Sequence, residues 1–199
     1  MPFEAAAVLV AAVLAPRLAA VPIVLPLLVV ASVSRWLCGR SFGEHVRGPA
    51  SYVAIGCGAG AVALALAFVV GAPLAEALSG GAVIWSEYPI VRGNASALAA
   101  VLVIVGATAI ASELVLRGWL VERVLELGRG PALLAIFVGA FAEALVTAGS
   151  LEARIGAFGF GVGLGWMYVA SGRNLVVPIS ARLAFQLGVV LLEAGRLVD

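Results

Sequence analysis

The stretch that decides the fold is residues 95–116, with the sequence ASALAAVLVIVGATAIASELVL. It is apolar or small almost throughout, and it is long enough to supply the ~20 residues with which a helix crosses the hydrocarbon core of a bilayer. Its one charged residue is Glu113. The stretch therefore predicts a membrane-spanning helix that carries a carboxylate to membrane depth.

Similar apolar stretches lie on both sides of it, at about Ala50–Val70, Pro131–Ala148, Gly156–Ala170 and Leu175–Leu192. The whole chain of 199 residues is 63% hydrophobic and only 12% charged, with a mean hydropathy of +1.16. We therefore expect an all-α, polytopic integral membrane helical bundle with about five to seven transmembrane helices, formed by residues 1–199 as a single membrane domain.

The N-terminal apolar region, Phe3–Leu37, is interrupted by prolines at positions 16, 22 and 26. It is compatible with a broken hairpin or with one tilted helix that follows an interfacial segment. Glu4 stands before the first apolar run where a signal peptide would have basic residues, so we do not expect a cleavable signal peptide.

The polar residues exclude several kinds of active site. Asp199 is the only aspartate, so the chain cannot form an aspartyl protease pair, and the single histidine, His45, argues against a serine triad or a two-histidine zinc site. Cys38 and Cys57 are too few for a cysteine-rich metal site, and we interpret them as small buried thiols. A net charge of +1 without a basic cluster predicts no binding of nucleic acid.

Arginines indicate the orientation. They are frequent in the Arg35–Arg47 loop and after residue 116, whereas the Pro73–Gly93 loop holds one arginine and two glutamates. The positive-inside bias places the first two regions in the cytoplasm. The arginines concerned are Arg35, Arg40, Arg47, Arg117, Arg123 and Arg129. On the same basis the Gly149–Arg154 turn falls outside and Arg173 inside.

Two groups of glycines predict faces where helices approach closely. The first group is Gly56, Gly58 and Gly60, and the second is Gly156, Gly159, Gly161, Gly163 and Gly165.

Four charged residues lie inside apolar stretches, where each costs about 2.5–3.5 kcal/mol on insertion scales. Glu113 and Arg117 are four residues apart, so they share a helix face and can form a local salt bridge. Glu143 has no cation nearby in sequence, and Arg182 has no acid. We expect Glu113, Glu143 and Arg182 to converge, because a buried ion pair is the least costly arrangement.

The segment Ala111–Leu120, ASELVLRGWL, resembles the E-E-x-x-x-R-G signature of the CPBP family, the CAAX protease and bacteriocin-processing intramembrane endopeptidases. Phe158-x-x-Gly161-x-x-x-Gly165-x-x-Tyr168-x-x-x-Gly172, followed by Pro178, resembles that family's glycine-rich helix and the start of its last conserved helix. The resemblance covers residues 95–186.

The resemblance implies a catalytic role for Glu113 as the glutamate that activates water, and it assigns Arg117 to the motif's arginine. Several other positions depart from the pattern. Ser112 stands in place of the first glutamate, Leu145 and Arg182 in place of histidines, and Gln186 in place of an asparagine. We therefore treat Glu113 and Arg117 as the catalytic candidates, and Ser112, Glu143, Arg182 and Gln186 as members of a polar core.

Two functions follow from this pattern. The first is a family member with a degraded catalytic site that acts as a non-catalytic binding or accessory subunit. The alternative is a divergent, active glutamate-type peptidase that uses Glu113 or Glu143, with Arg182 as the oxyanion donor. A small transporter ranks last, because the sequence shows no inverted repeat.

Either function implies a particular setting. We expect a protein of the bacterial inner (cytoplasmic) membrane, with the lipid bilayer and another membrane protein or a transmembrane or lipidated peptide as partners. We expect no cofactor and no metal, because glutamates alone make a poor zinc site.

Overall fold

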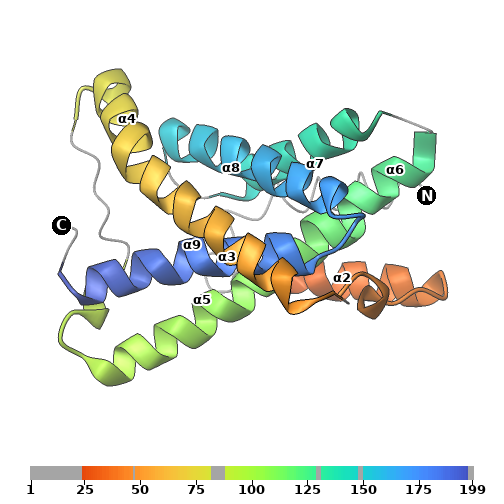
Figure 1. The fold of residues 1–199 in the computed structure, drawn as a ribbon, viewed down its shortest axis with the longest axis horizontal. Coiled ribbons are helices and arrows are strands. Elements are labelled where there is room, and N and C mark those ends of the chain that lie inside the picture. The colour runs from red at the N-terminus through yellow and green to blue at the C-terminus, as the bar shows by residue number, and fades with distance from the viewer. Residues whose placement is uncertain (1–23, 47, 82–87, 129–130, 148–149, 197–199) are drawn as a thin grey trace.

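A computed structural model describes residues 24–46, 48–81, 88–128, 131–147 and 150–196, and these described residues are almost entirely helical, with no strand among them (Figure 1). The predicted all-α fold class is thereby confirmed. The N-terminal alternatives, a broken hairpin or a single tilted helix, concern residues 1–23 and lie outside the described part.

Two of the helices are longer than the sequence predicted. Helix α3 (Ala50–Leu66) continues through the π-helical segment η3 (Ala67–Gly71) into α4 (Ala72–Ser79), beyond the expected end at Val70. Pro73 explains why the end was expected there, since proline removes a backbone hydrogen bond and crowds the preceding turn. The wider π turn directly before Pro73 accommodates it, and the helix runs on.

Helix α5 (Ala95–Val115) likewise continues, through the π-helical segment η5 (Leu116–Val121), into α6 (Glu122–Gly128). The expected end at Leu116 was wrong because Arg117 is a buried part of this helix rather than a loop residue. The Asn94 side chain caps the start of α5 by accepting a hydrogen bond from the Ala97 backbone N–H at 3.1 Å.

The other helices are α2 (Val24–Leu37), α7 (Ala132–Val146), α8 (Leu151–Ala170) and α9 (Val176–Ala194), with the short 3₁₀ turns η2 (Phe42–His45) and η4 (Pro89–Val91). Helix α8 begins before the expected Gly156, because the Ser150 hydroxyl caps its first turn. Most of the expected Gly149–Arg154 turn is therefore helix.

The helices pack in two main pairs, α3 along α9 and α7 along α8, and α5 packs against both α9 and α2 (Figure 1). The α5–α6 helix and α9 run antiparallel through the middle of the bundle, while α4 diverges from it. This arrangement brings α5, α7 and α9, the three helices with charged residues in their apolar stretches, around one point.

Some of the predicted glycine faces are correct. A Cβ at Gly56 or Gly60 would collide with α9, one at Gly161 would collide with α7, and one at Gly165 would be in tight contact with Ile136 of α7. The two glycines of each pair are four residues apart, which places each pair on one helix face. The prediction was wrong for the other glycines, around which a Cβ would meet open space: Gly58, Gly156, Gly159 and Gly163.

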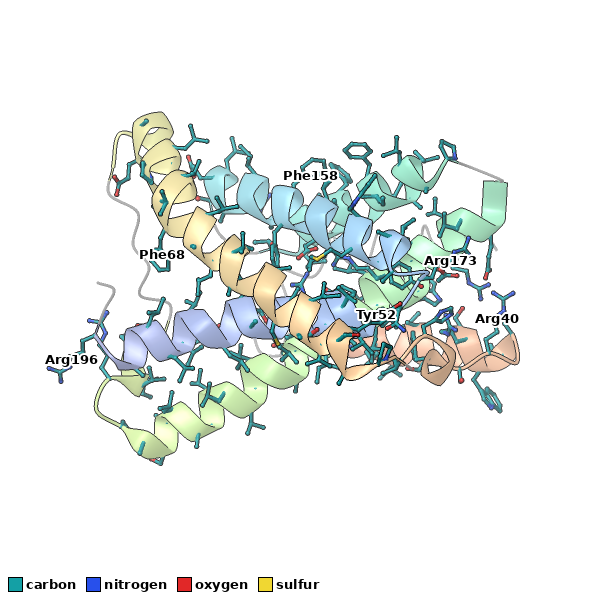
Figure 2. The ribbon with its side chains drawn as sticks, in the orientation of Figure 1. Arg40, Tyr52, Phe68, Phe158, Arg173 and Arg196 are labelled. Atoms are coloured by element: carbon teal, nitrogen blue, oxygen red, sulfur yellow. The ribbon has the colours of Figure 1, made fainter. Side chains whose placement is uncertain are left out.

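Within the described residues, three helices are long and apolar enough to cross a membrane, namely Ala50–Ala77, Ala95–Glu126 and Val176–Ala194. Two shorter apolar helices, Pro26–Leu37 and Ala132–Val146, accompany them. The chain is thus an all-α membrane bundle, and the figure of five to seven crossings stays a prediction. Arg40 and Arg173 lie at one end of the molecule and Arg196 at the other (Figure 2).

Candidate functional site

Four charged side chains from three parts of the chain meet inside the bundle. Glu113 comes from α5 and Arg117 from η5, while α7 supplies Glu143 and α9 supplies Arg182. We call these four residues the ion quartet. The expected convergence of Glu113, Glu143 and Arg182 is therefore present, with Arg117 as a fourth member.

Hydrogen bonds close the ion quartet into a ring of alternating charge. Arg117 donates from Nη1 to Glu113 Oε1 at 3.0 Å and from Nη2 to Glu143 Oε2 at 2.7 Å. Arg182 donates from Nε to Glu113 Oε1 at 2.5 Å and from Nη2 to Glu143 Oε1. Two carboxylates and two guanidinium groups give a formal charge of zero.

The ion quartet is buried. The side chains of Glu113 and Arg117 are fully buried, and those of Glu143 and Arg182 are 5% and 7% exposed. The predicted local salt bridge between Glu113 and Arg117 is present. It lies in the interior of the protein and is joined to two other helices.

Gly161 allows α8 to take part in the site. Arg117 Nη2 also donates to the Gly161 carbonyl oxygen at 2.8 Å, and a Cβ at this position would lie 2.9 Å from both Ala140 Cα and Glu143 Oε2. The glycine at this contact therefore lets the α8 backbone reach the ion quartet.

The ring of charges constrains the chemistry of Glu113. A general base must accept a proton, and protonation of Glu113 would leave the buried ion quartet with a net charge of +1. Glu113 Oε2 is nevertheless fully covered and accepts no hydrogen bond from the described residues. The arrangement can therefore act as a closed structural core, and Glu113 Oε2 is the carboxylate oxygen on which any proton chemistry would depend.

The structure leaves Ser112 and Gln186 outside the ring of hydrogen bonds. The Ser112 hydroxyl donates to the Thr108 carbonyl oxygen of its own helix at 2.8 Å. Gln186 lies one turn after Arg182, and its Oε1 atom is covered without a donor among the described residues. Leu145, on α7, is partly buried.

Two aromatic rings flank the ion quartet where α8 meets α9. Phe160 of α8 and Phe185 of α9 lie with ring centroids 4.8 Å apart. The Arg182 guanidinium carbon is 5.6 Å from the Phe160 ring centroid, in a cation–π contact. Both rings are half-buried.

Sequence reasoning missed three buried charged residues. Arg35 was expected in a polar loop, but it lies in the last turn of α2 and donates to the Gly118 carbonyl oxygen at 2.6 Å. Glu122 accepts a hydrogen bond from the Tyr168 hydroxyl at 2.8 Å. Both residues flank apolar runs rather than interrupt them, so the sequence carries no signal of their burial.

Glu193 is the third buried residue that the sequence did not reveal. It is fully buried and accepts a hydrogen bond from the Tyr88 backbone N–H at 2.8 Å, with Arg92 Nε 3.8 Å away. It directly follows the apolar run of α9 rather than interrupting it, so the criterion that identified Glu143 and Arg182 does not find it.

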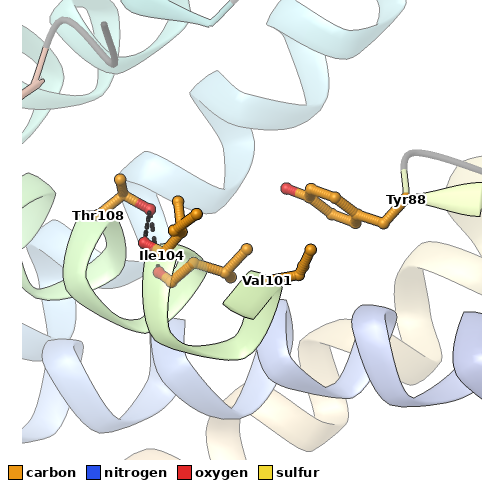
Figure 3. A pocket seen from close by; sticks show the side chains of 5 residues that line it. Tyr88, Val101, Ile104 and Thr108 are labelled. Atoms are coloured by element: carbon orange, nitrogen blue, oxygen red, sulfur yellow. Dashed lines mark hydrogen bonds between the residues drawn. The ribbon is translucent and has the colours of Figure 1, made fainter. Parts of the chain in front are cut away.

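A pocket of about 360 Å³ lies beside α5 and contains no member of the ion quartet. It is lined by Tyr88, Val101, Ile104, Val105 and Thr108. The Thr108 hydroxyl is satisfied by the carbonyl oxygens of Ile104 and Val105, both at 3.0 Å (Figure 3). The pocket is therefore a mainly apolar feature with little to orient a polar ligand.

The described residues contain no cluster of three or more histidine, cysteine, aspartate or glutamate side chains that could hold a metal ion. Cys38 and Cys57 are both exposed, so the interpretation of them as small buried thiols was wrong.

Residues 94–188 match the sequence model of a family described as Rce1-like, type II CAAX prenyl endopeptidase Rce1-like. No curated protein and no solved structure matches the chain. The matched residues include α5, α7, α8 and the ion quartet.

Proposed function

Residues 94–188 belong to the Rce1-like family, as the sequence resemblance predicted, and from this premise we propose that the chain is a non-catalytic member of that family that binds membrane segments without cleaving them. The chain keeps two residues of the motif, Glu113 and Arg117, within the matched region. It uses these two residues as half of a structural ion quartet.

The observation that carries this proposal is the closed ring of charges. Glu113 Oε1 accepts hydrogen bonds from both arginines, and each arginine also donates to Glu143. A glutamate that activates water must be free to exchange a proton with it. Here that exchange would upset the charge balance of a buried ion quartet.

The substituted positions support the same conclusion. The resemblance implies histidines where Leu145 and Arg182 stand, and a leucine side chain can neither orient a water molecule nor take its proton. Arg182 occupies its position as the partner of two carboxylates.

One observation favours the alternative, a divergent active glutamate-type peptidase. Glu113 Oε2 is covered but has no donor among the described residues, so one oxygen of the candidate catalytic glutamate is not engaged by an arginine. In that function Glu113 would activate a water molecule and Arg182 would stabilise the oxyanion.

A binding and cleavage assay separates the two functions. The purified protein in phospholipid vesicles is incubated with fluorescent prenylated peptides and with transmembrane peptides, and both energy transfer on binding and peptide fragments are measured. We expect binding without cleavage. Cleavage by the wild type that is lost in Glu113→Gln would overturn the non-catalytic function and support the peptidase.

We also propose the bacterial cytoplasmic membrane as the location, with the Arg40 and Arg173 end facing the cytoplasm. The support is the excess of arginines at that end. Arg35 and Arg117 do not contribute to this excess, because both side chains are buried in the bundle.

A further inference from the structure

The turn that ends α2 places an arginine at the surface of the protein. Gly39 adopts the left-handed conformation, with a φ of +65°, and its N–H donates to the Trp36 carbonyl oxygen at 2.9 Å. The Arg40 N–H donates to the Arg35 carbonyl oxygen at 3.0 Å, which completes the pair of hydrogen bonds with which a glycine commonly ends a helix. Arg40 is therefore fixed at the arginine-rich end of the molecule, and its side chain is 49% exposed (Figure 2).

Helix α6 brings a second arginine to the same place. Arg123 donates from Nη2 to Cys38 Sγ at 3.0 Å and to Ser34 Oγ at 3.3 Å, so α6 is joined to the end of α2. Arg123 Nη1 lies 3.1 Å from Glu126 Oε2, and Arg40 Nη1 pairs with Glu126 Oε1. Two guanidinium groups thus share one carboxylate, and these three side chains carry a formal charge of +1. We call Arg40, Arg123 and Glu126 the arginine pair site.

Arg40 keeps donors for a ligand. Among the described residues its side chain contacts only Glu126, through Nη1, so Nε and Nη2 can donate to an acceptor from outside the chain. A guanidinium can bind a phosphate through two parallel N–H groups. The charge of the arginine pair site favours a ligand whose net charge is −1.

An apolar stripe on α2 leads to the arginine pair site. Five large hydrophobic side chains of this helix are about half exposed or more, and they recur at the spacing of one helix face. The stripe extends over residues 29–37, which is about 12 Å along the helix axis. Its members are Val29, Val30, Val33, Trp36 and Leu37.

We propose that the end of α2 binds one anionic phospholipid, with the phosphate on Arg40 and an acyl chain along the apolar stripe. Phosphatidylglycerol has a net charge of −1, which balances the arginine pair site. Phosphatidylcholine has the same phosphate but also a positive choline, so it would leave the excess charge uncompensated. A soluble phosphate would leave the apolar stripe without a partner. The lipid site shares no residue with the ion quartet.

Quenching of tryptophan fluorescence by brominated lipids tests this site, because Trp36 belongs to the stripe and is 75% exposed. The protein is placed in phosphatidylcholine vesicles that contain increasing fractions of phosphatidylglycerol with brominated acyl chains, or of brominated phosphatidylcholine. The signal that is lost in Trp36→Phe isolates the quenching at Trp36. We expect phosphatidylglycerol to bind there roughly fivefold more tightly than phosphatidylcholine, as for one uncompensated arginine at a membrane surface.

Two arginine variants provide a matched comparison. Arg40→Gln removes both the donors and the excess charge, so we expect equal binding of the two lipids. Arg173→Gln is the control, because Arg173 is 51% exposed at the same end and has Glu122 as its own partner, 3.7 Å away. We expect this control to keep the preference for phosphatidylglycerol. A preference that persists in Arg40→Gln, or that Arg173→Gln abolishes equally, would overturn the inference.

Glu126→Gln changes the charge in the opposite direction. It raises the formal charge of the arginine pair site from +1 to +2, so phosphatidylglycerol should be preferred more strongly than by the wild type. A weaker preference than that of the wild type would contradict the role of the excess charge.

Other occupants of the stripe give different results. Quenching of Trp36 by neither lipid would show that a protein surface covers the stripe, and the lipid site would be wrong. Equal quenching by both lipids, together with binding of soluble glycerol phosphate that Arg40→Gln abolishes, would assign the arginines to a free phosphate instead. Equal quenching without such binding would also overturn the inference.

Discussion

Arg182 contacts both carboxylates of the ion quartet, so its replacement tests how the quartet stabilises the fold. Arg182→Leu leaves two buried glutamates facing one arginine, and we expect a loss of about 3–5 kcal/mol in the free energy of unfolding. Arg182→Leu/Glu143→Leu keeps a neutral Glu113–Arg117 pair and should lose much less. Unfolding of the purified variants in mild detergent measures both. Equal losses would mean that pairing is not what stabilises this core.

Arg35 supports a second prediction at the same scale. Its guanidinium donates to the Gly118 carbonyl oxygen inside the bundle, and Arg35→Met removes this donor from a buried acceptor. We expect a loss of about 1–3 kcal/mol in the free energy of unfolding. The matched control is Arg40→Met, because Arg40 is 49% exposed and its ion pair with Glu126 should contribute less than about 1 kcal/mol. Similar losses in the two variants would contradict the role of Arg35.

Sequence reasoning at the residue scale worked where a charge interrupts an apolar run. Glu143 and Arg182 have no local counter-charge, and the need for partners from other helices follows from the cost of burying a charge. Arg35 could not be found in this way. It lies at the end of an apolar helix, where a charged residue is equally compatible with water, and only the packing of α2 against α5 decides that it is buried.

The α7–α8 pair gives a prediction at the scale of the element. Gly161 and Gly159 lie on the same helix, but a Cβ at Gly161 would press on the α7 backbone, while one at Gly159 would meet open space. We expect Gly161→Ala to lower the free energy of unfolding by about 1–3 kcal/mol, as overpacking does. Gly159→Ala should be neutral or slightly stabilising, because alanine favours the helix by about 1 kcal/mol.

Unfolding in detergent distinguishes the two glycine variants. A Gly159→Ala protein that is as destabilised as Gly161→Ala would show that helix packing does not account for the difference. Energy transfer between dyes on α7 and α8 provides an independent readout, since only the Gly161 substitution should separate the two helices.

The positions of helices α3, α5, α7, α8 and α9 followed from hydropathy, but the ends of these helices did not. Arg117 looked like the boundary of a span because a charge normally ends an apolar run. Glu113 and Glu143 balance the charge of Arg117 inside the protein, so the helix continues past this residue. The start of α8 was also misplaced, since Ser150 caps the helix several residues before the apolar stretch begins.

Orientation in the membrane can be tested at the scale of the whole molecule. Cys38 is exposed and lies just beyond α2, next to Arg40 at the arginine-rich end. We expect a membrane-impermeant thiol reagent to label Cys38 in inside-out vesicles and not in right-side-out vesicles, in a Cys57→Ala background. Arg196→Cys in a background without other cysteines should show the opposite pattern, because residue 196 lies at the other end (Figure 2). Labelling of both sites from one side would reject the single orientation.

The order in which the helices are made follows from the way the ion quartet is distributed along the chain. Helix α5 and segment η5 bring Glu113 and Arg117 together, so they enter the membrane as a neutral pair. Helix α7 then adds Glu143 and a charge of −1, which persists until α9 delivers Arg182, 39 residues later in sequence. A nascent chain that stops before α9 therefore carries an uncompensated carboxylate in the bilayer, a feature by which membrane quality control can distinguish unfinished chains from finished ones.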